Sequence, residues 1–158
     1  MKILGVDPGS GIVGFGFIEL TKNKPKLIDA GVIRTIVGND VSSRLVEVYD
    51  ALQELLEEHK PDVAVVEKLF FAQNVTTAMI VSQARGVILL ALEKAKVPVF
   101  EYTPLQIKMA MTGYGRATKA QMQELVRIQL GLKEIPKPDD CADALAAALT
   151  HITSIRVQ

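Results

Sequence analysis

The sequence is poor in the side chains that form disulfide bonds and zinc sites. Its 158 residues include one cysteine, Cys141, two histidines and no tryptophan. A single cysteine cannot form an internal disulfide, and its reduced state fits a compartment such as the cytoplasm. Zinc is bound mainly by cysteine and histidine, so a zinc centre is disfavoured. Any metal would be held by oxygen ligands, as Mg²⁺, Mn²⁺ and Ca²⁺ are.

Net charge and long apolar runs are lacking as well. Eighteen basic residues balance eighteen acidic ones, so the formal net charge is zero. No uninterrupted apolar run reaches the roughly 18–20 residues that cross a bilayer. The start, "MKILGVD", is too short and too acidic for a signal peptide. We therefore expect one soluble, cytoplasmic domain over residues 1–158, with no membrane partner.

Charge is nevertheless distributed unevenly along the chain. Residues 102–133 carry five basic side chains against Glu124 alone. Such a segment is typical of a phosphate-binding surface, but it also fits a solvated helical face, and composition does not decide between the two.

The hydrophobic pattern changes period along the chain and predicts an α/β domain. Three strands come first, and the sequence continues with helices that alternate with two short apolar strands. This order predicts a mixed sheet with an antiparallel edge and a parallel centre, covered by helices on both faces. The predicted strands span 2–7, 12–20, 26–35, 62–67 and 97–102, and the helices 43–58, 74–96, 104–112, about 119–130 and about 139–154.

Local signals mark the ends of several elements. Thr118 with Gln121 is typical of a capping box, and Gly113 and Gly131 are expected to end the two helices before them. The other predicted features are a cap at Ser42 or Ser43 for the first helix, an N-cap at Asn74, a first helical residue at Pro104 after Thr103, and a bulge at Gly31.

A glycine-rich stretch, "GVDPGSGIVGFG", fits the dinucleotide-binding spacing G-x-G-x-x-G at Gly9, Gly11 and Gly14. That fingerprint needs a helix after the turn, because the pyrophosphate sits on the helix N-terminus. Here a period-two strand follows. We therefore expect the glycines to serve as turn residues with positive φ and as positions of close approach. The functional residue of the stretch is then Asp7, at the end of the first strand.

Acidic side chains gather at corresponding places in the predicted fold. Glu67 ends the fourth strand, and in parallel strands two C-terminal acids lie side by side. The last helix begins with Asp139, Asp140 and Asp143, of which either the 140/143 or the 139/143 pair shares a face. Acids at a helix start also complement its dipole, which would explain one of them but not the whole set.

Several carboxylates at close range repel one another, and divalent cations remove that conflict. Two Mg²⁺ ions about 3.5–4 Å apart are a known arrangement for cleaving phosphodiesters. The acids therefore indicate metal-assisted phosphodiester cleavage.

Five stretches spread along the chain carry a resemblance to a known family. They are "GVDPGS" at 5–10, "VVEKLFFAQN" at 65–74, "QARGV" at 83–87, "VFEYTPLQIK" at 99–108 and "DDCADALAAALTH" at 139–151. Together they are similar to the RuvC Holliday-junction resolvases, members of the RNase H-like nucleases. The resemblance covers nearly the whole chain. It implies an RNase H-like fold with a five-stranded mixed sheet, and a Mg²⁺-dependent endonuclease that nicks two symmetric strands of a four-way DNA junction in recombination and repair.

The resemblance also implies roles for particular residues. Asp7, Glu67, Asp140 and Asp143 match the catalytic, metal-binding acids, with Asp139 the competitor of Asp140. The other matches are Phe70 for an aromatic that wedges against junction bases, with Phe71 as its alternative, and Lys108 and Lys119 for contacts to DNA phosphates, with Arg85 and Arg116 as weaker candidates. Two Mg²⁺ ions per site are implied, with Mn²⁺ able to substitute.

The resemblance further implies a homodimer and a branch-migration helicase as partner. The long helix at 74–96 is the expected interface, because its apolar residues Met79, Ile80, Val87, Leu90 and Leu92 occupy more than one side. The alternatives are a relative that cuts RNA or an RNA/DNA hybrid, a nucleotide-binding module, and a junction binder without activity. A nucleotide-binding module needs another domain to close around nucleotide. The full acid set argues against a junction binder without activity.

Overall fold

The order of helices and strands agrees with the pattern in the sequence. The computed structural model describes residues 1–68 and 75–156. Along the chain run β1 (Lys2–Asp7), β2 (Ile12–Thr21), β3 (Lys24–Arg34), α1 (Val41–His59), β4 (Val63–Glu67), α2 (Val75–Lys94), β5 (Val99–Tyr102), α3 (Pro104–Thr112), α4 (Lys119–Leu130) and α5 (Asp139–Arg156).

One five-stranded sheet, in the order β3-β2-β1-β4-β5, forms the centre of the molecule. β1 pairs antiparallel with β2 and parallel with β4, so the predicted mixed sheet is confirmed. Val6 of β1 is the register partner of Val66 of β4. The next residues, Asp7 and Glu67, therefore emerge side by side at the carboxyl edge of the sheet.

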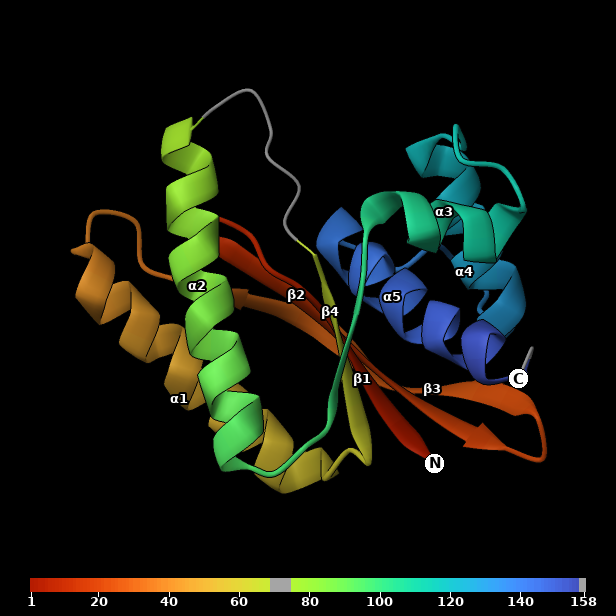
Figure 1. Cartoon of the computed structure of the whole chain (residues 1–158), viewed down its shortest axis with the longest axis horizontal. Helices are drawn as coiled ribbons and strands as arrows, with labels where there is room; N and C mark the ends of the chain where they lie inside the picture. The colour runs from red at the N-terminus through yellow and green to blue at the C-terminus, as the bar shows by residue number, and fades with distance from the viewer. Residues whose placement is uncertain (69–74, 157–158) are drawn as a thin grey trace.

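Helices cover both faces of the sheet, as predicted (Figure 1). α1 and α2 pack on one face over Leu4, Val6 and Phe17, among other apolar residues. α3, α4 and α5 pack on the other face over Ile3, Ile18 and Val65. Because side chains alternate along a strand, each central strand supplies apolar residues to both cores.

The glycines of β1 and β2 allow α5 to lie directly against the sheet. A Cβ atom on Gly5 would overlap the carbonyl oxygen of Ala144, and one on Gly14 would overlap that of Asp140. The expected close approach is thus confirmed, and it brings the first turns of α5 next to the end of β1. The expected positive φ at Gly9 and Gly11 is wrong. A Cβ on Gly9 would instead overlap the carbonyl oxygen of Ile12, so this turn needs glycine for space.

Gly14→Ala is therefore expected to lower the free energy of unfolding by about 1–3 kcal/mol, because the added methyl group must displace α5. Urea denaturation of the variant measures the loss. Gly86→Ala in α2 is the matched control, since a Cβ there meets nothing within 4 Å. The control should change stability by less than about 1 kcal/mol. Equal stability of Gly14→Ala and the unsubstituted protein would contradict the close packing.

Two local predictions are wrong, and the others that can be checked are confirmed. Asp40, not Ser42 or Ser43, caps α1, because its carboxylate accepts a hydrogen bond from the Ser43 N–H at 2.7 Å. The β-bulge lies opposite the Phe17/Ile18 step rather than at Gly31, whose Cβ position is crowded by the ring of Phe15. The capping boxes at Thr103 and Thr118 are present, and Gly113 and Gly131 end their helices with left-handed backbone. The predicted cap Asn74 lies outside the described residues.

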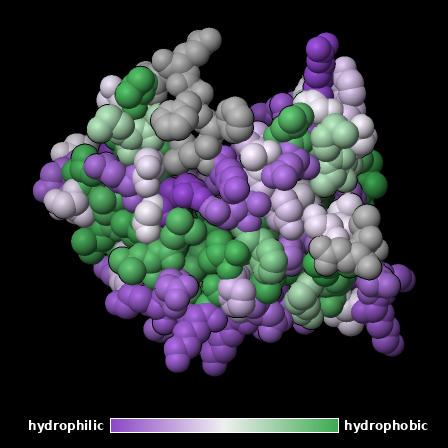
Figure 2. Space-filling model, in the orientation of Figure 1, coloured by the Kyte–Doolittle hydropathy of each residue, from purple (hydrophilic) through white to green (hydrophobic). Residues whose placement is uncertain are grey.

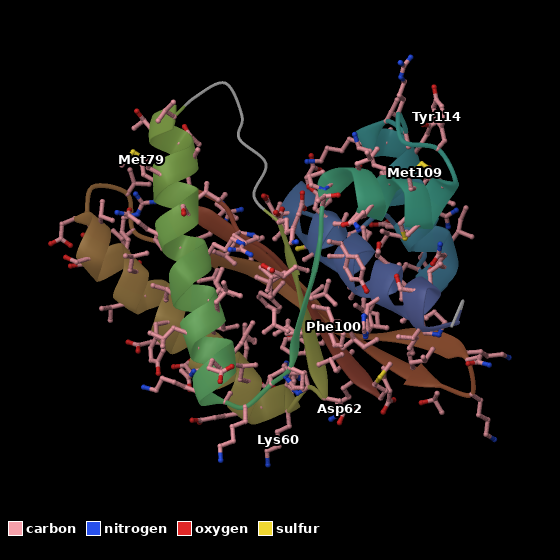
Figure 3. All side chains as sticks on the ribbon, in the orientation of Figure 1. Lys60, Asp62, Met79, Phe100, Met109 and Tyr114 are labelled. Carbon is pink, nitrogen blue, oxygen red and sulfur yellow. The ribbon has the colours of Figure 1, made fainter. Side chains whose placement is uncertain are left out.

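α2 buries few of its apolar residues. Ala84, Ile88, Ala91 and Leu92 pack against the sheet side, whereas Met79 and Leu90 are 62% and 55% exposed. Figure 2 shows hydrophobic residues over the middle of α2 and towards β5, and Figure 3 labels Phe100 beside them and Met79 nearer the start of α2. By length and composition alone α2 could also cross a membrane, a criterion that helices of soluble proteins meet too.

Candidate active site

Four predicted acids converge at the carboxyl edge of β1 and β4. Asp7 and Glu67 are the last residues of these parallel neighbours. Asp140 and Asp143 lie in the first turns of α5, which crosses the same edge above Gly14. This convergence has three causes. They are the apolar sequences that form the strands, the shared direction of β1 and β4, and the glycines under α5.

The pKa of Asp7 shows how strongly its surroundings oppose a charge. Burial raises the pKa of Asp7 from 3.8 to about 8, and the charges of Glu67, Asp143 and Asp140 add to the rise, against a smaller effect of Lys119. No hydrogen bond or ion pair reaches the Asp7 carboxyl within residues 1–68 and 75–156. The group is thus an acceptor that no described donor satisfies.

Glu67 and Asp143 lie in the same environment. Burial raises the pKa of Glu67 to about 7, Asp143 adds to the rise, and Lys108 and Lys119 oppose it. The pKa of Asp143 is also raised, mainly by burial, although its hydrogen bond and ion pair with Lys119 hold it down. Strongly shifted carboxyls that face one another are characteristic of functional sites.

Asp140 and Asp139 have different surroundings in the structure. Asp140 acts on the charge of Asp7, whereas Asp139 does not contribute to the pKa of Asp7 or of Glu67. The Asp139 side chain is 60% exposed and pairs with Lys119 instead. The 140/143 alternative therefore stays a prediction, which the charges acting on Asp7 favour.

The two predicted lysines lie beside the acids, at the start of α4 and in α3. Together with Glu67 and Asp143 they line a cavity of about 220 Å³. Lys119 Nζ lies 3.1 Å from Asp143 Oδ2 and 3.4 Å from Asp139 Oδ2. Partial burial lowers the pKa of Lys119, but its bond to Asp143 and the charges of both acids raise it above the ordinary value. No local pattern around Lys119 predicts this ion pair.

Other basic residues of the 102–133 segment lie elsewhere. Arg127 makes an ion pair with Glu124 on the surface of α4, and Arg116 is exposed. Arg85 of α2, outside that segment, forms an ion pair with Glu101 of β5 and is partly buried. The basic segment is therefore partly a site, at Lys108 and Lys119, and partly a solvated surface.

The chemistry of the four acids fits a hard divalent cation. Carboxylate oxygens are the ligands that Mg²⁺ and Mn²⁺ prefer, and a cation would counter the repulsion that raises these pKa values. Within the described part of the chain, no three Asp, Glu, His or Cys side chains are close enough together to hold a metal ion, so the four acids are neighbours but not a preformed metal centre. Cys141 and His151 are buried in the core.

His151 is instead a structural residue. Its Nδ1 lies 3.0 Å from the Tyr102 hydroxyl, and its ring packs against Phe100. Phe70 and Phe71, the candidates for contact with DNA bases, lie outside the described residues.

A second surface near Asp140 was missed in the sequence. A groove of about 530 Å³ runs beside this acid and is lined by Gly9–Gly11, Arg34 and Arg44, among other residues. Arg34 ends a strand and Arg44 opens an acidic stretch, so neither position signals a shared site. Only the pairing of β2 with β3 and the packing of α1 bring them together.

Comparison with known proteins gives a consistent result. The sequence model of the family described as "Crossover junction endodeoxyribonuclease RuvC" matches residues 3–151. The crossover junction endodeoxyribonuclease RuvC of Brevibacillus brevis is 55% identical over 96% of this chain and 91% of its own length.

Solved structures agree with this result. The structure of Thermus thermophilus RuvC superposes with a TM-score of 0.92 at 36% identity and covers 99% of this chain and 96% of that one. The same protein in complex with Holliday junction substrate gives a TM-score of 0.90 at 34% identity, with the same coverage of both chains. The five-stranded fold with helices on both faces is thus the fold of these proteins.

Proposed function

Because this chain belongs to the RuvC family of crossover junction endodeoxyribonucleases, we propose that it resolves four-way DNA junctions by nicking two symmetric strands. Such an enzyme acts in homologous recombination and repair, and we assign it to the cytoplasm as a single domain. The observation that carries the proposal is the grouping of Asp7 with three other carboxyls: its burial and their charges raise the pKa of Asp7 to about 8.

Asp7, Glu67, Asp140 and Asp143 are assigned as the catalytic acids that hold Mg²⁺, two ions per site, with Mn²⁺ as a substitute. A bound divalent ion supplies a polarised phosphate and a water of lowered pKa. The chain's own part is to present the four carboxyls from β1, β4 and α5. The strand ends fix Asp7 and Glu67, and the helix fixes the other two against the glycines of the sheet.

The DNA backbone is expected to approach from the side of Lys108 and Lys119. Both line the cavity that also holds Glu67 and Asp143. A phosphate brought there gains favourable interactions with the ammonium groups and is held beside the acids. Phe70, just beyond Glu67 in the sequence, is assigned to contact with junction bases.

Lys119→Ala is expected to weaken junction binding and to lower the slope of log affinity against log salt concentration by about one, because one phosphate contact is lost. Fluorescence anisotropy in EDTA across a salt series measures the slope without cleavage. Lys133→Ala, at an exposed position after α4, is the matched control and should keep the slope. An unchanged slope in Lys119→Ala would remove this residue from the phosphate contacts.

The exposed apolar face of α2 is assigned to a homodimer. Apolar side chains as exposed as Met79 and Leu90 are stabilised when a second copy covers them. Met79→Glu combined with Leu90→Glu should therefore yield a monomer at micromolar concentration by sedimentation, where the unsubstituted protein is a dimer. Ile128→Glu replaces an equally exposed apolar residue on α4 and should remain dimeric. A monomeric unsubstituted protein would contradict the assignment.

Substrate choice separates the proposal from its alternative, a nuclease that acts on RNA or an RNA/DNA hybrid. Labelled four-way junction, linear duplex and hybrid are incubated with the protein in Mg²⁺ and in EDTA. The proposal expects cutting of the junction alone and only with Mg²⁺. Preferential cutting of the hybrid would favour the alternative. A branch-migration helicase is the expected partner that brings the junction to the enzyme.

A further inference from the structure

Basic side chains lie on two sides of the four acids. The proposed function uses those on one side, Lys108 and Lys119. In the sheet order β3-β2-β1-β4-β5, Glu67 lies on one side of Asp7, towards Lys108 and Lys119. On the other side, β2 begins at Ile12, whose register partner is Arg34, the last residue of β3. The same edge of the sheet thus ends in Arg34 beyond Asp7. The groove between Arg34 and Asp140 is about 530 Å³ in volume.

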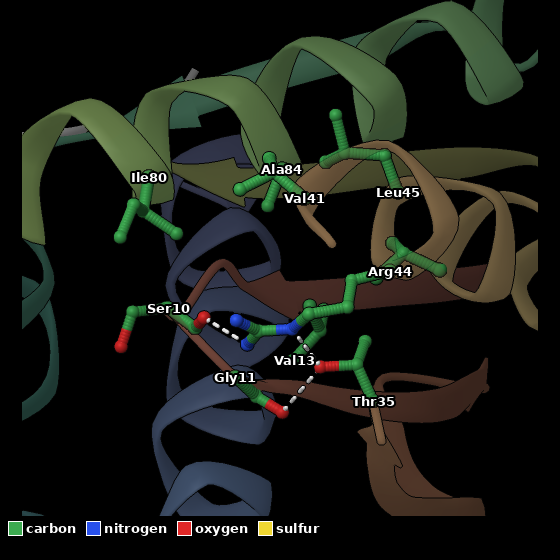
Figure 4. Close-up of a pocket in the computed structure, with 11 residues that line it drawn as sticks. Ser10, Gly11, Val13, Thr35, Val41, Arg44, Leu45, Ile80 and Ala84 are labelled. Atoms are coloured by element: carbon green, nitrogen blue, oxygen red, sulfur yellow. Dashed lines mark hydrogen bonds between the residues drawn. The ribbon is translucent and has the colours of Figure 1, made fainter. Parts of the chain in front are cut away.

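Arg44 of α1 is held in this groove by defined contacts. Its Nη2 donates to the Ser10 carbonyl at 2.6 Å, and its Nε donates to the Thr35 hydroxyl at 2.8 Å. Figure 4, a view of the neighbouring pocket under α2, shows the guanidinium between Ser10 and Thr35 with both hydrogen bonds. A guanidinium has five N–H donors, so these bonds fix its plane and leave donors for a ligand.

Arg34 is unpaired as far as the described residues go. Its side chain is exposed, and neither Arg34 nor Arg44 has a carboxylate within ion-pair distance in the described chain. The loop between them adds further donors. No hydrogen bond from the backbone N–H of Gly9, Ser10 or Gly11 is found within residues 1–68 and 75–156. Two guanidiniums and a loop whose N–H groups make no described hydrogen bond thus line one groove, a combination suited to an anion.

We propose that Arg34 and Arg44 bind a second phosphate of the strand being cut, on the opposite side of the scissile phosphate from Lys108 and Lys119. A strand that crosses the acids must leave the site in both directions. One direction passes the two lysines and the other passes the groove. Arg44 is held by its hydrogen bonds to Ser10 and Thr35. Arg34, at the edge of the sheet, lines the same groove. This inference rests on the proposed junction-cutting function and adds the path of the strand.

The first test uses Arg34→Gln, because this exposed side chain makes no described contact whose loss would unfold the protein. Binding to a four-way junction in EDTA is expected to weaken roughly 3- to 10-fold, and the slope of log affinity against log salt is expected to fall by about one. Lys24→Gln removes the same charge from an exposed position at the far end of β3 and should change affinity less than twofold. Equal effects of both variants, or none of either, would overturn the inference.

The second test locates the contact. Single methylphosphonates, which are uncharged, are placed in turn on each side of the cut in the junction strand. For the unsubstituted protein, one neutral position on the side away from Lys108 and Lys119 should weaken binding. In Arg34→Gln that position should no longer matter, whereas the positions on the lysine side should keep their effect. The same sensitivity profile in both proteins would overturn the inference.

Different results would overturn the second phosphate contact and the proposed junction-cutting function. Cutting of the junction by the unsubstituted protein, together with an unchanged profile in Arg34→Gln, overturns the second phosphate contact alone. Failure of the unsubstituted protein to bind or cut a four-way junction overturns the proposed function and, with it, the inference.

Discussion

Asp7→Asn is expected to slow junction cutting by roughly 10³-fold or more while it changes junction affinity by less than about twofold. The lost carboxylate removes several kcal/mol of stabilisation of a metal-assisted transition state, and each 1.36 kcal/mol is a tenfold change in rate. The affinity is kept because the DNA contacts are assigned to basic residues, and Asp7 has no described hydrogen bond or ion pair. Single-turnover cleavage and anisotropy in EDTA measure the two effects.

Asp139→Asn is the matched control for this experiment, and Asp140→Asn is its counterpart. Asp139 is 60% exposed and does not act on the pKa of Asp7, so its variant should cut within about threefold of the unsubstituted rate. Asp140→Asn should behave like Asp7→Asn. Retained cutting by Asp7→Asn would contradict the mechanism, and a reversed result for the two helix acids would move the third ligand to Asp139.

In the absence of metal, the same Asp7→Asn substitution is expected to stabilise the protein at neutral and alkaline pH. The pKa of Asp7 is raised from 3.8 to about 8 by burial and by neighbouring acids. A raised pKa in the folded state means that the stability present below pH 4 is lost as pH rises towards and through 8, because the unfolded chain releases its proton first. With allowance for solvent screening, the loss is on the order of 2–3 kcal/mol.

Divalent cations should reverse the order of the two proteins. A ligand that binds only the folded state stabilises it, and the unsubstituted protein holds the fuller set of carboxylates. Thermal unfolding at pH 5, 7 and 9, in EDTA and in Mg²⁺, measures both effects. Asp50→Asn removes an exposed acid from α1 and should follow the unsubstituted protein throughout. A Mg²⁺-induced gain as large in Asp7→Asn as in the unsubstituted protein would contradict the assignment of Asp7 as a metal ligand.

Much of the fold and the acid set could be predicted because the signals are local. Apolar runs ending in Asp7 and Glu67 identify strand ends, and the parallel pairing that a buried run implies sets them side by side. The Thr118 capping box and the glycine at the end of α4 depend on neighbouring residues only, so they were predictable too. The resemblance to the resolvases supplied the functional meaning of these positions.

The features that could not be predicted depend on the path of a turn or on residues far apart in the sequence. Gly9 serves to clear the Ile12 carbonyl rather than to adopt positive φ, which depends on the particular path of the turn. The ion pairs of Lys119 with Asp139 and Asp143 need the packing of α4 on α5. Arg34 and Arg44 share a groove only because β3 pairs with β2 and α1 folds back onto the loop after Asp7.

Junction resolution through bound metal is decided by mapping the nicks in a four-way junction labelled on two opposing strands. We expect one nick in each strand, at symmetric positions, in Mg²⁺ and none in EDTA, with both nicks absent for Asp7→Asn in either condition. Cutting in EDTA, nicks at unrelated positions, or undiminished nicking by Asp7→Asn would contradict an enzyme whose four convergent carboxyls cut the junction through bound metal.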